Sequence, residues 1–242
     1  MTTHPRLHNP ACDVDAAADA AALAQGLAVS GADNRDGVRG RLAWLAACLR
    51  QLGEQPTTVM DYGCGIGAAT PAFFEGLGVT AVVGTDRAPR ALDVARQAYG
   101  SERARFLLFD HDHPHAALDL VYCHGVFHHL LPYARVAAVA YVWQALRPGG
   151  LWAFWEHNPW HPGTRYVMHR RPCDRDAIPL TPPEARRLLL AGGFEILRTD
   201  FLCLFPRRLT WLRGLEARLV RWPLGAQYQV LCRRPYLKRR CP

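Results

Sequence analysis

Short apolar runs alternate with stretches of helical composition along the middle of the chain. The runs cover residues 57–62, 79–86, 103–110, 118–123 and 151–157. Residues 88–99 and 132–146, which lie between them, have the composition of helices. This alternation predicts βαβ units and therefore an α/β fold with a doubly wound, mostly parallel sheet. Within the last run, alternation places Trp152 and Phe154 on one face of the sheet and Trp155 on the other.

The flanking segments complete the expected architecture. Residues 11–26 and 36–52 predict two helices before the sheet. After the last run, residues 158–183 are rich in Pro, Arg and His and are expected to form a long irregular lid or substrate loop. A helix, a strand, a basic amphipathic helix and a final strand are expected at residues 182–191, 194–205, 207–222 and 227–232. About twenty residues join the last two strands, enough to reverse direction, so we expect seven strands with an antiparallel last strand.

Length and composition limit the number of domains that the chain can form. A chain of 242 residues, half of them apolar, can bury the core of one α/β domain. We expect residues 1–56 to form an N-terminal helical cap and residues 57–242 the main domain. No stretch of about 18 apolar residues lacks a charge, and MTTHPRLHNP is no secretory leader, so we expect a cytoplasmic protein. The eight cysteines form no C-x-x-C pair, which predicts reduced, mostly buried thiols and no metal site.

Positive charge is concentrated in the C-terminal third of the chain. Residues 161–242 contain 17 Lys and Arg against 6 acids, whereas residues 1–160 contain 12 against 15. Such a surface attracts nucleic acid, anionic lipid or a small acidic substrate. Apart from residues 238–240, the arginines are scattered rather than clustered as in a nucleic-acid patch. We therefore expect no specific nucleic-acid partner and leave open a weak contact with an anionic membrane surface.

The segment VMDYGCGIG, residues 59–67, places an acid at a strand end, then glycines at every second position, then a helix. Glycine allows positive φ and close approach of the backbone to a ligand, and a helix N-terminus offers N–H donors. Gly63, Gly65 and Ala68 also satisfy the looser dinucleotide fingerprint, so two cofactor classes fit the glycines. Asp61 favours one of them, because a carboxylate would repel a pyrophosphate but pair with the ammonium group of a methionine moiety.

Two further acids close the next two predicted strands. Asp86 could accept hydrogen bonds from both hydroxyls of a ribose, which fits a nicotinamide cofactor equally well. Asp110 lies at the edge of the sheet where ligands collect and could accept a hydrogen bond from an adenine amino group. Each acid alone could instead cap a helix. The three together favour a bound nucleoside.

In this order, these motifs resemble those of the class I S-adenosylmethionine-dependent methyltransferases. The resemblance covers about residues 57–157 and includes HGVFHHL after the fourth run and LRPGGLW before the fifth. It implies a Rossmann-like methyltransferase fold with S-adenosylmethionine as cofactor and S-adenosylhomocysteine as product. Arg39 and Arg41 are further candidates for the cofactor carboxylate. The residues that the resemblance assigns to the cofactor are Asp61, Tyr62, Gly63, Cys64, Gly65, Asp86, Arg87, Asp110, His111 and His124.

Histidines near the ends of the fourth and fifth predicted strands are the candidates for chemistry. Methyl transfer from a sulfonium is an in-line displacement, so the protein must align the reactants and can remove a proton from the acceptor. His128 matches in position the base of some small-molecule O-methyltransferases, although in other members a His-His pair here packs against the sheet or the cofactor. His157 points toward the same edge, with Glu156 and Asn158 as orienting groups.

The loop 158–183 supplies the candidates for acceptor binding. The rings of Trp160 and Tyr166 could stack on a flat acceptor or face the sulfonium. Arg165 could bind an acceptor carboxylate or phosphate through paired hydrogen bonds. Three other loop arginines could bind the acceptor in the same way: Arg170, Arg171 and Arg175. All four arginines could equally be solvated surface charges.

The sequence therefore favours an enzyme that methylates a small molecule, in secondary metabolism, with the acceptor atom (O, N, S or C) left open. The tail resembles that of bacterial members of unassigned substrate. One alternative is methylation of a glycan or a lipid head group through the basic helix at residues 207–222. Another is an NAD-binding oxidoreductase that uses the same glycines. An enzyme that methylates nucleic-acid bases is disfavoured, because HNPW at residues 157–160 only partly matches the N-P-P-(Y/F) motif.

Overall fold

The computed structural model of the protein describes residues 31–109, 116–170, 177–202 and 218–236. The expected helix at residues 11–26 and most of the expected basic helix lie outside the described residues. The described strands are β1 Thr58–Tyr62, β2 Ala81–Asp86, β3 Ala104–Leu108, β4 Leu118–His124, β5 Leu146–His157, β6 Glu195–Leu202 and β7 Gln227–Arg233.

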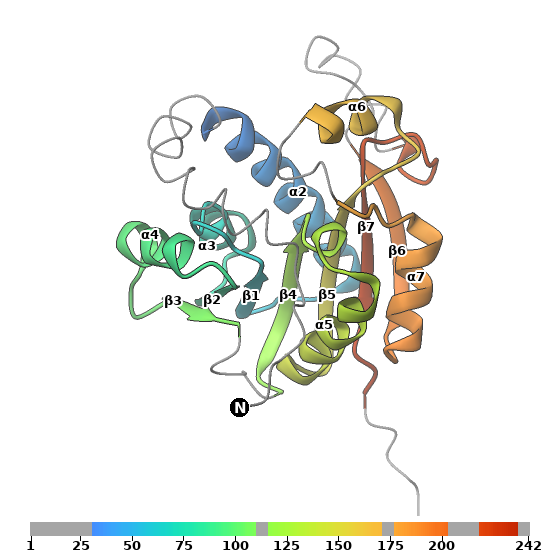
Figure 1. The fold of residues 1–242 in the computed structure, drawn as a ribbon. Coiled ribbons are helices and arrows are strands. Elements are labelled where there is room, and N and C mark those ends of the chain that lie inside the picture. Colours follow the sequence, from blue (N-terminus) through green and yellow to red (C-terminus); the bar gives the residue numbers. More distant parts are fainter. Residues whose placement is uncertain (1–30, 110–115, 171–176, 203–217, 237–242) are drawn as a thin grey trace, which may run out of the picture.

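The strands form one sheet in the order β3-β2-β1-β4-β5-β7-β6 (Figure 1). Neighbouring strands from β3 to β5 are parallel, whereas β7 is antiparallel to both β5 and β6. The prediction of a doubly wound, mostly parallel seven-stranded sheet with an antiparallel last strand is confirmed. The strand order changes direction between β1 and β4. Open α/β sheets bind their ligands outside the carboxyl ends of the strands at such a point.

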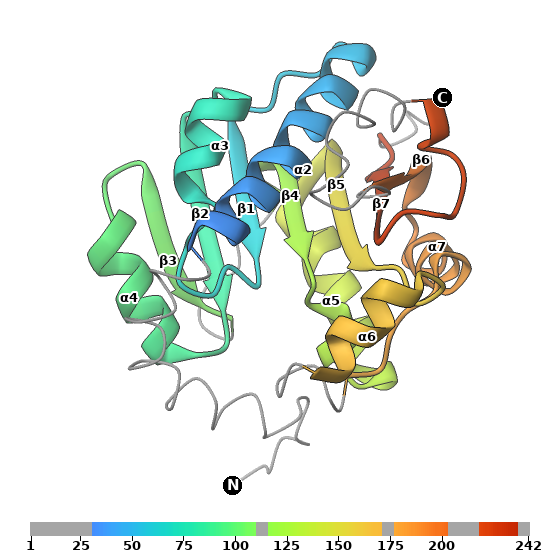
Figure 2. The same cartoon turned by 90° about the horizontal axis from the view of Figure 1, so that it is seen from above.

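Helices cover both faces of the sheet, with α2 and α3 on one side and α5 and α7 on the other (Figure 2). The expected irregular segment at residues 158–183 instead contains a helix, α6, above the carboxyl edge. No described helix is long and apolar enough to cross a membrane. The described helices are α2 Gly31–Leu52, α3 Thr70–Leu77, α4 Pro89–Tyr99, the short 3₁₀ helix η1 Phe127–His129, α5 Pro132–Ala145, α6 Pro162–Arg170 and α7 Pro182–Ala191.

Each face of the sheet has its own hydrophobic core. Trp152 and Phe154 lie in the core beneath α5 and α7, and Trp155 lies in the core beneath α2, α3 and α4, as the alternation predicted. Leu42 and Leu45 of α2 are almost completely buried in this second core. The described part of the expected cap therefore packs directly on the sheet. Its separation from the rest of the chain at residue 56 remains a prediction.

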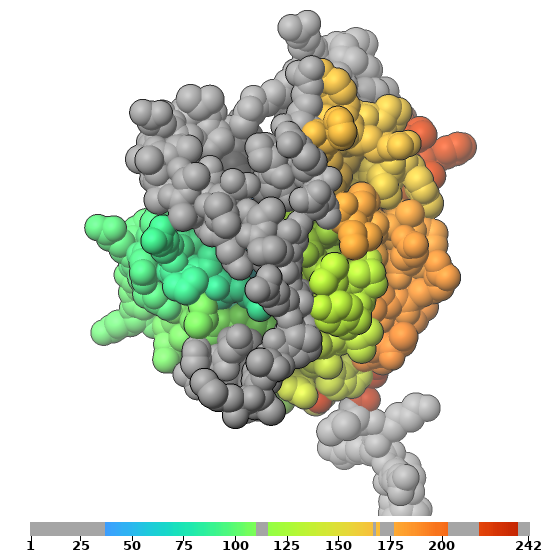
Figure 3. Space-filling model, in the orientation of Figure 1, coloured from blue at the N-terminus to red at the C-terminus, as the bar shows by residue number. Residues whose placement is uncertain are grey.

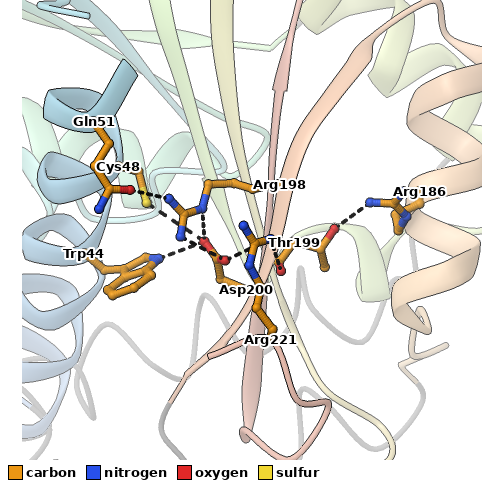
Figure 4. Close-up of polar contacts among 8 residues, drawn as sticks. All are labelled: Trp44, Cys48, Gln51, Arg186, Arg198, Thr199, Asp200 and Arg221. Atoms are coloured by element: carbon orange, nitrogen blue, oxygen red, sulfur yellow. Dashed lines mark hydrogen bonds and ion pairs between the residues drawn. The ribbon is translucent and has the colours of Figure 1, made fainter. Parts of the chain in front are cut away.

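A buried carboxylate on β6 fixes α2 to the sheet (Figure 4). Asp200 is fully buried, and its Oδ2 accepts hydrogen bonds from Trp44 Nε1 at 3.0 Å and Arg198 Nε at 2.6 Å. Arg221 Nη1 lies 3.6 Å from Oδ1 of the same residue. A carboxylate withdrawn from water needs such compensation. These contacts hold α2 in the position from which it carries Arg41 toward the strand ends.

Candidate functional site

The glycine turn after β1 packs closely against the end of β2 and against Val126, as its glycines predicted. Gly63 and Gly65 have φ values of +76° and +53°, which favour glycine. The N–H groups of Gly63 and Cys64 donate to the Thr85 carbonyl oxygen at 2.8 and 3.0 Å, joining the turn to β2. A Cβ atom at Gly63 would lie 2.3 Å from Cγ2 of Val126. Only glycine fits there without a shift.

Asp61 is a buried carboxylate next to this turn. Its side chain is 4% exposed, and among the described residues it accepts no hydrogen bond. Burial, followed by the negative charge of Asp86, raises the pKa of the Asp61 carboxyl to about 7, although the charge of Arg41 opposes the shift. A carboxylate in this setting is stabilised by a cation that it can pair with. It therefore suits the ammonium group expected from the sequence.

Asp86 joins the glycine turn to the start of α4. Its Oδ2 accepts a hydrogen bond from the Gly65 N–H at 2.8 Å, and its Oδ1 accepts one from the Ala88 N–H at 2.9 Å. Asp86 is thus held rigidly at the mouth of the site. The N-cap of α4 is Ala88, without a side-chain cap, so Asp86 does not take the helix-capping role that sequence reasoning left open. Each carboxylate oxygen can accept a second hydrogen bond, so a role toward a ribose stays compatible with both contacts.

A cavity of about 220 Å³ opens at the carboxyl ends of β1, β2 and β4. Five of the predicted cofactor residues line it, and Cys64 and Gly65 lie in the adjoining turn. Asp110 and His111 fall outside the described residues. Sequence reasoning missed Phe109, although it precedes Asp110, and included Gly125, Val126 and Leu130 only within a motif. The lining residues are Tyr62, Gly63, Thr85, Asp86, Arg87, Ala88, Phe109, His124, Gly125, Val126, His129 and Leu130.

These features fit the cofactor that the sequence implied. Asp61 offers a buried negative charge, and Gly63 leaves room that a side chain would fill. Asp86 is fixed at the end of β2, where a ribose would meet it. Tyr62 and Phe109 form an edge-to-face pair with ring centroids 5.4 Å apart, which gives the cavity an aromatic wall. The individual contacts of these residues with a cofactor remain predictions.

Behind the cavity, His128 pairs with Glu156. His128 Nδ1 and Glu156 Oε2 are 2.7 Å apart, and the two side chains are 2% and 1% exposed. Oε1 of Glu156 also accepts the Phe127 N–H at 2.7 Å. Burial alone would raise the pKa of Glu156, but the charge and the hydrogen bond of His128 hold it below its usual value. We expected Glu156 to orient His157. Glu156 Oε2 accepts the backbone N–H of His157 at 3.4 Å and lies 2.7 Å from His128 Nδ1, and an orienting role toward the His157 ring stays a prediction.

Several histidine rings lie around this pair. The His157 ring centroid is 5.3 Å from that of His128 and 5.8 Å from that of His124. His124 lines the cavity. A Cβ atom at Gly125, also in the cavity wall, would lie 3.4 Å from Cε1 of His128 and 4.0 Å from Nε2 of His157. Both predicted catalytic histidines therefore lie directly behind the wall of the cofactor cavity.

The predicted acceptor-binding residues are placed differently. Trp160 and Tyr166 are 49% and 59% exposed and do not line the cavity, and Arg165 is also exposed. Their role in acceptor binding is untested and stays a prediction. Arg171 and Arg175 lie outside the described residues, as does the side chain of Arg170.

The two arginines of α2 differ from each other. Arg41 is buried and donates to the Tyr122 hydroxyl at 2.8 Å and to Gln227 Oε1 at 3.2 Å. Its charge also acts on Asp61. Arg39 is exposed and lies 3.8 Å from Glu75. No group of three or more potential metal ligands occurs in the described ranges.

Comparison with known families and proteins agrees with this site. Residues 60–152 match the family described as a methyltransferase domain. The demethylmenaquinone methyltransferase of Deinococcus radiodurans is 29% identical over 119 residues, which cover 47% of this chain and 48% of that protein. The match thus spans about half the length of this curated relative.

Solved structures show the same fold. An S-adenosylmethionine-dependent methyltransferase from Mesorhizobium loti has 23% identity and a TM-score of 0.54, with 73% of this chain and 90% of that chain covered. A chain from the complex of the Haloferax volcanii Trm112 methyltransferase activator with the putative methyltransferase has 18% identity and a TM-score of 0.61. That match covers 88% of this chain and 96% of the other.

Proposed function

The chain carries a class I S-adenosylmethionine-dependent methyltransferase domain, and from this premise we propose that it methylates a small-molecule acceptor that gives up a proton. The observation that carries the proposal is the buried pair of His128 and Glu156 behind the cofactor cavity. Methyl transfer to a hydroxyl or a protonated amine releases a proton, and the group that takes it must lie close to the acceptor.

Glu156 acts as a positioning residue in this proposal. The lowered pKa of Glu156 keeps its carboxylate ionised. The carboxylate accepts a hydrogen bond from the N–H at Nδ1 of His128. With Nδ1 committed in this way, Nε2 is the basic nitrogen of the neutral ring. A carboxylate that fixes the tautomer and orientation of a histidine base is a recurrent arrangement in catalysis.

The remaining residues of the site would bind the cofactor and align the reactants. When bound, S-adenosylmethionine supplies an electrophilic methyl group on a sulfonium. Asp61 and the N–H groups of the glycine turn would hold its methionine part, and Asp86 its ribose. His128 would take the proton of the acceptor, directly at the wall formed by Gly125 or through the neighbouring His157 and His124 rings. The acceptor would receive the methyl group as the carbon–sulfur bond breaks, and S-adenosylhomocysteine would leave. The low exposure of the His128–Glu156 pair keeps bulk water away from this proton.

Calorimetry with S-adenosylhomocysteine and NADH in parallel tests the cofactor. We expect micromolar or tighter binding of S-adenosylhomocysteine and none of NADH; tight binding of NADH alone would overturn the proposal in favour of an oxidoreductase. A screen with methyl-labelled cofactor then tests the acceptor. The panel should include hydroxylated and amino secondary metabolites, demethylmenaquinone, glycans and lipid head groups. Transfer only to acceptors that lose no proton would contradict the role of His128.

A further inference from the structure

Two exposed segments at the carboxyl edge of the sheet form one surface. α6 follows β5 and residues 218–226 lead into β7. The two overlap in Figure 1, and in Figure 2 only the end of residues 218–226 approaches the start of the α6 segment. The backbone N–H of Asn158 and the hydroxyl of Thr164 each donate to the Ala226 carbonyl oxygen at 2.9 Å. The Asn158 side chain, fully buried, donates to the Gly225 carbonyl oxygen at 2.8 Å. These bonds hold the two segments together.

Large apolar side chains on this surface face solvent. The exposed fractions are 49% for Trp160, 59% for Tyr166, 61% for Trp222 and 50% for Leu224. Single exposed apolar residues are ordinary, but a group of them marks an interaction site. Residues 221–224 are all exposed, in a turn where the Leu224 N–H donates to the Trp222 carbonyl oxygen at 2.7 Å. Nothing in the described part of the chain covers this turn.

The charge around these side chains has one sign. Residues 157–170 and 218–233 contain no Asp or Glu. Arg165 and Arg218 are exposed. The Arg221 side chain is 60% exposed, but its Nη1 lies 3.6 Å from the buried carboxylate of Asp200, so Arg165 and Arg218 supply the charge that can reach a lipid phosphate. Trp and Tyr combine an apolar body with a polar tip, and Arg can extend its charge toward phosphate while its stem lies on apolar surface. This combination is typical of proteins that lie at a bilayer surface.

We propose that residues 160–166 and 221–224 dock the protein on an anionic lipid bilayer. Trp222 and Leu224 enter the boundary between head groups and acyl chains, and the arginines pair with lipid phosphates. A bilayer accepts the aliphatic Leu224 and Pro223 as readily as the indoles. A nucleic acid offers stacking only to the aromatic and guanidinium groups, so the composition favours lipid.

The position of the surface also suits a membrane. In the space-filling view α6 forms part of the upper rim of the molecule, and residues 218–226 border it on the right (Figure 3). This is the edge at which the strands deliver the residues of the cofactor cavity. Docking would therefore bring the edge that carries the site toward the bilayer, whatever the acceptor is.

Co-sedimentation of the full chain with vesicles tests the proposal. Vesicles of phosphatidylcholine alone are compared with vesicles that also contain phosphatidylglycerol, without cofactor, at low and high salt. We expect binding to the anionic vesicles that weakens at high salt. The double variant Trp222→Ser/Leu224→Ser should lower the partition coefficient at least about tenfold. The double variant Arg165→Gln/Arg218→Gln should lower it on anionic vesicles and flatten the salt dependence.

Matched controls come from other parts of the surface. Tyr236→Ser removes an aromatic ring that is 60% exposed beyond the end of β7, and Arg90→Gln removes an exposed charge on α4; both should bind vesicles like the unchanged protein. Thermal unfolding and S-adenosylhomocysteine binding verify that each variant folds. Absence of vesicle binding at low salt overturns the proposal, as does equal loss in the controls. Binding of single-stranded RNA in place of vesicles, or loss only of self-association in the Trp222→Ser/Leu224→Ser variant, also overturns it.

Discussion

His128 and Glu156 form a buried hydrogen-bonded pair across two strand ends, with Nδ1 and Oε2 2.7 Å apart. His128 comes from the 3₁₀ helix after β4, and Glu156 comes from the end of β5. Glu156 is 1% exposed. Ionising such a buried carboxylate costs free energy unless hydrogen bonds and nearby positive charge offset the loss of water. The pair therefore specifies the arrangement of both strand ends, next to the cofactor cavity.

We predict that loss of either partner removes turnover but not cofactor binding. His128→Asn and Glu156→Gln should each lower kcat by about 10²- to 10⁴-fold, the usual contribution of a general base, while the S-adenosylhomocysteine affinity stays within about threefold. Single-turnover transfer and calorimetry check this. The acidic limb of the pH profile, which reports the deprotonation of the base, should shift to lower pH in Glu156→Gln, an effect that a purely structural role would not produce. A loss of cofactor binding equal to the loss of turnover would count against the assignment.

The same carboxylate governs stability at acid pH. The folded-state pKa of Glu156 is lowered, so its contribution to the free energy of unfolding is present above the ordinary pKa and is lost as the pH falls through the folded value. Glu156→Ala should destabilise the protein at neutral pH by about 3 to 5 kcal/mol, because the buried His128 loses its partner. Urea unfolding at several pH values measures both effects. Glu75→Ala, an exposed acid on α3, serves as the control and should change little.

Asp61 should produce the opposite pH dependence. Burial raises its pKa in the folded chain to about 7 from an ordinary 3.8, so its protonation stabilises the fold. This contribution is complete below about pH 4 and is lost as the pH rises through 7. Asp61→Asn should therefore raise the melting temperature at pH 8, with the gain fading below about pH 5. A gain that stays constant from pH 5 to pH 8 would refute the buried, uncompensated state of Asp61.

Asp61 and Asp86 should both be needed for the cofactor. Asp61→Ala and Asp86→Ala are each expected to weaken S-adenosylhomocysteine binding by about tenfold or more, since a hydrogen bond to a charged group contributes about 1.5 to 3 kcal/mol. In the unchanged protein the affinity should rise between pH 6 and pH 8, as Asp61 ionises, and Asp61→Asn should lose that rise. Calorimetry measures these affinities, and Asp93→Ala on α4 is the control. Unaltered binding in both variants would exclude the proposed contacts.

Gly63 and Gly65 offer a matched pair of substitutions. A Cβ atom at Gly63 would lie 2.3 Å from Val126, whereas a Cβ atom at Gly65 would meet no atom within 4 Å. Both positions have positive φ, so alanine strains the backbone at each by a similar amount, of order 1 kcal/mol. Gly63→Ala should therefore weaken S-adenosylhomocysteine binding more than Gly65→Ala. The double variant Gly63→Ala/Val126→Ala should recover part of that loss, and an identical effect of the two single variants would argue against the steric cause.

The fold could be predicted from the sequence because its signals are local. Alternating apolar runs and helical stretches defined the parallel sheet, and the spacing of the last two strands gave the antiparallel β7. The glycine turn with Asp61 and Asp86 predicted a cofactor site at the carboxyl edge, where the structure has a cavity, since parallel strands deliver their carboxyl ends to one edge. α6 was missed because Pro162 and Gly163 at its start resemble a loop.

Other parts of the site depend on contacts between distant segments. The sequence placed Glu156 beside His157, its neighbour in the chain, yet the folded sheet turns its carboxylate to His128. Side-chain direction at a strand end follows from the pleat and from packing on the adjacent strand. The sequence likewise assigned Trp160 and Tyr166 to a pocket, and the position of α6 leaves them on the surface.

The sequence by itself thus determined that the sheet is mostly parallel and that acids stand at the ends of β1 and β2, and it predicted the edge for the cofactor. Each of these follows from residues adjacent in the chain. The tertiary structure alone decided that the Asp61 carboxyl would be buried enough to raise its pKa, that His128 would pair with Glu156, and that residues 158–166 would join residues 221–226 in one surface. These relations depend on desolvation and on contacts across the sheet, which no local pattern encodes.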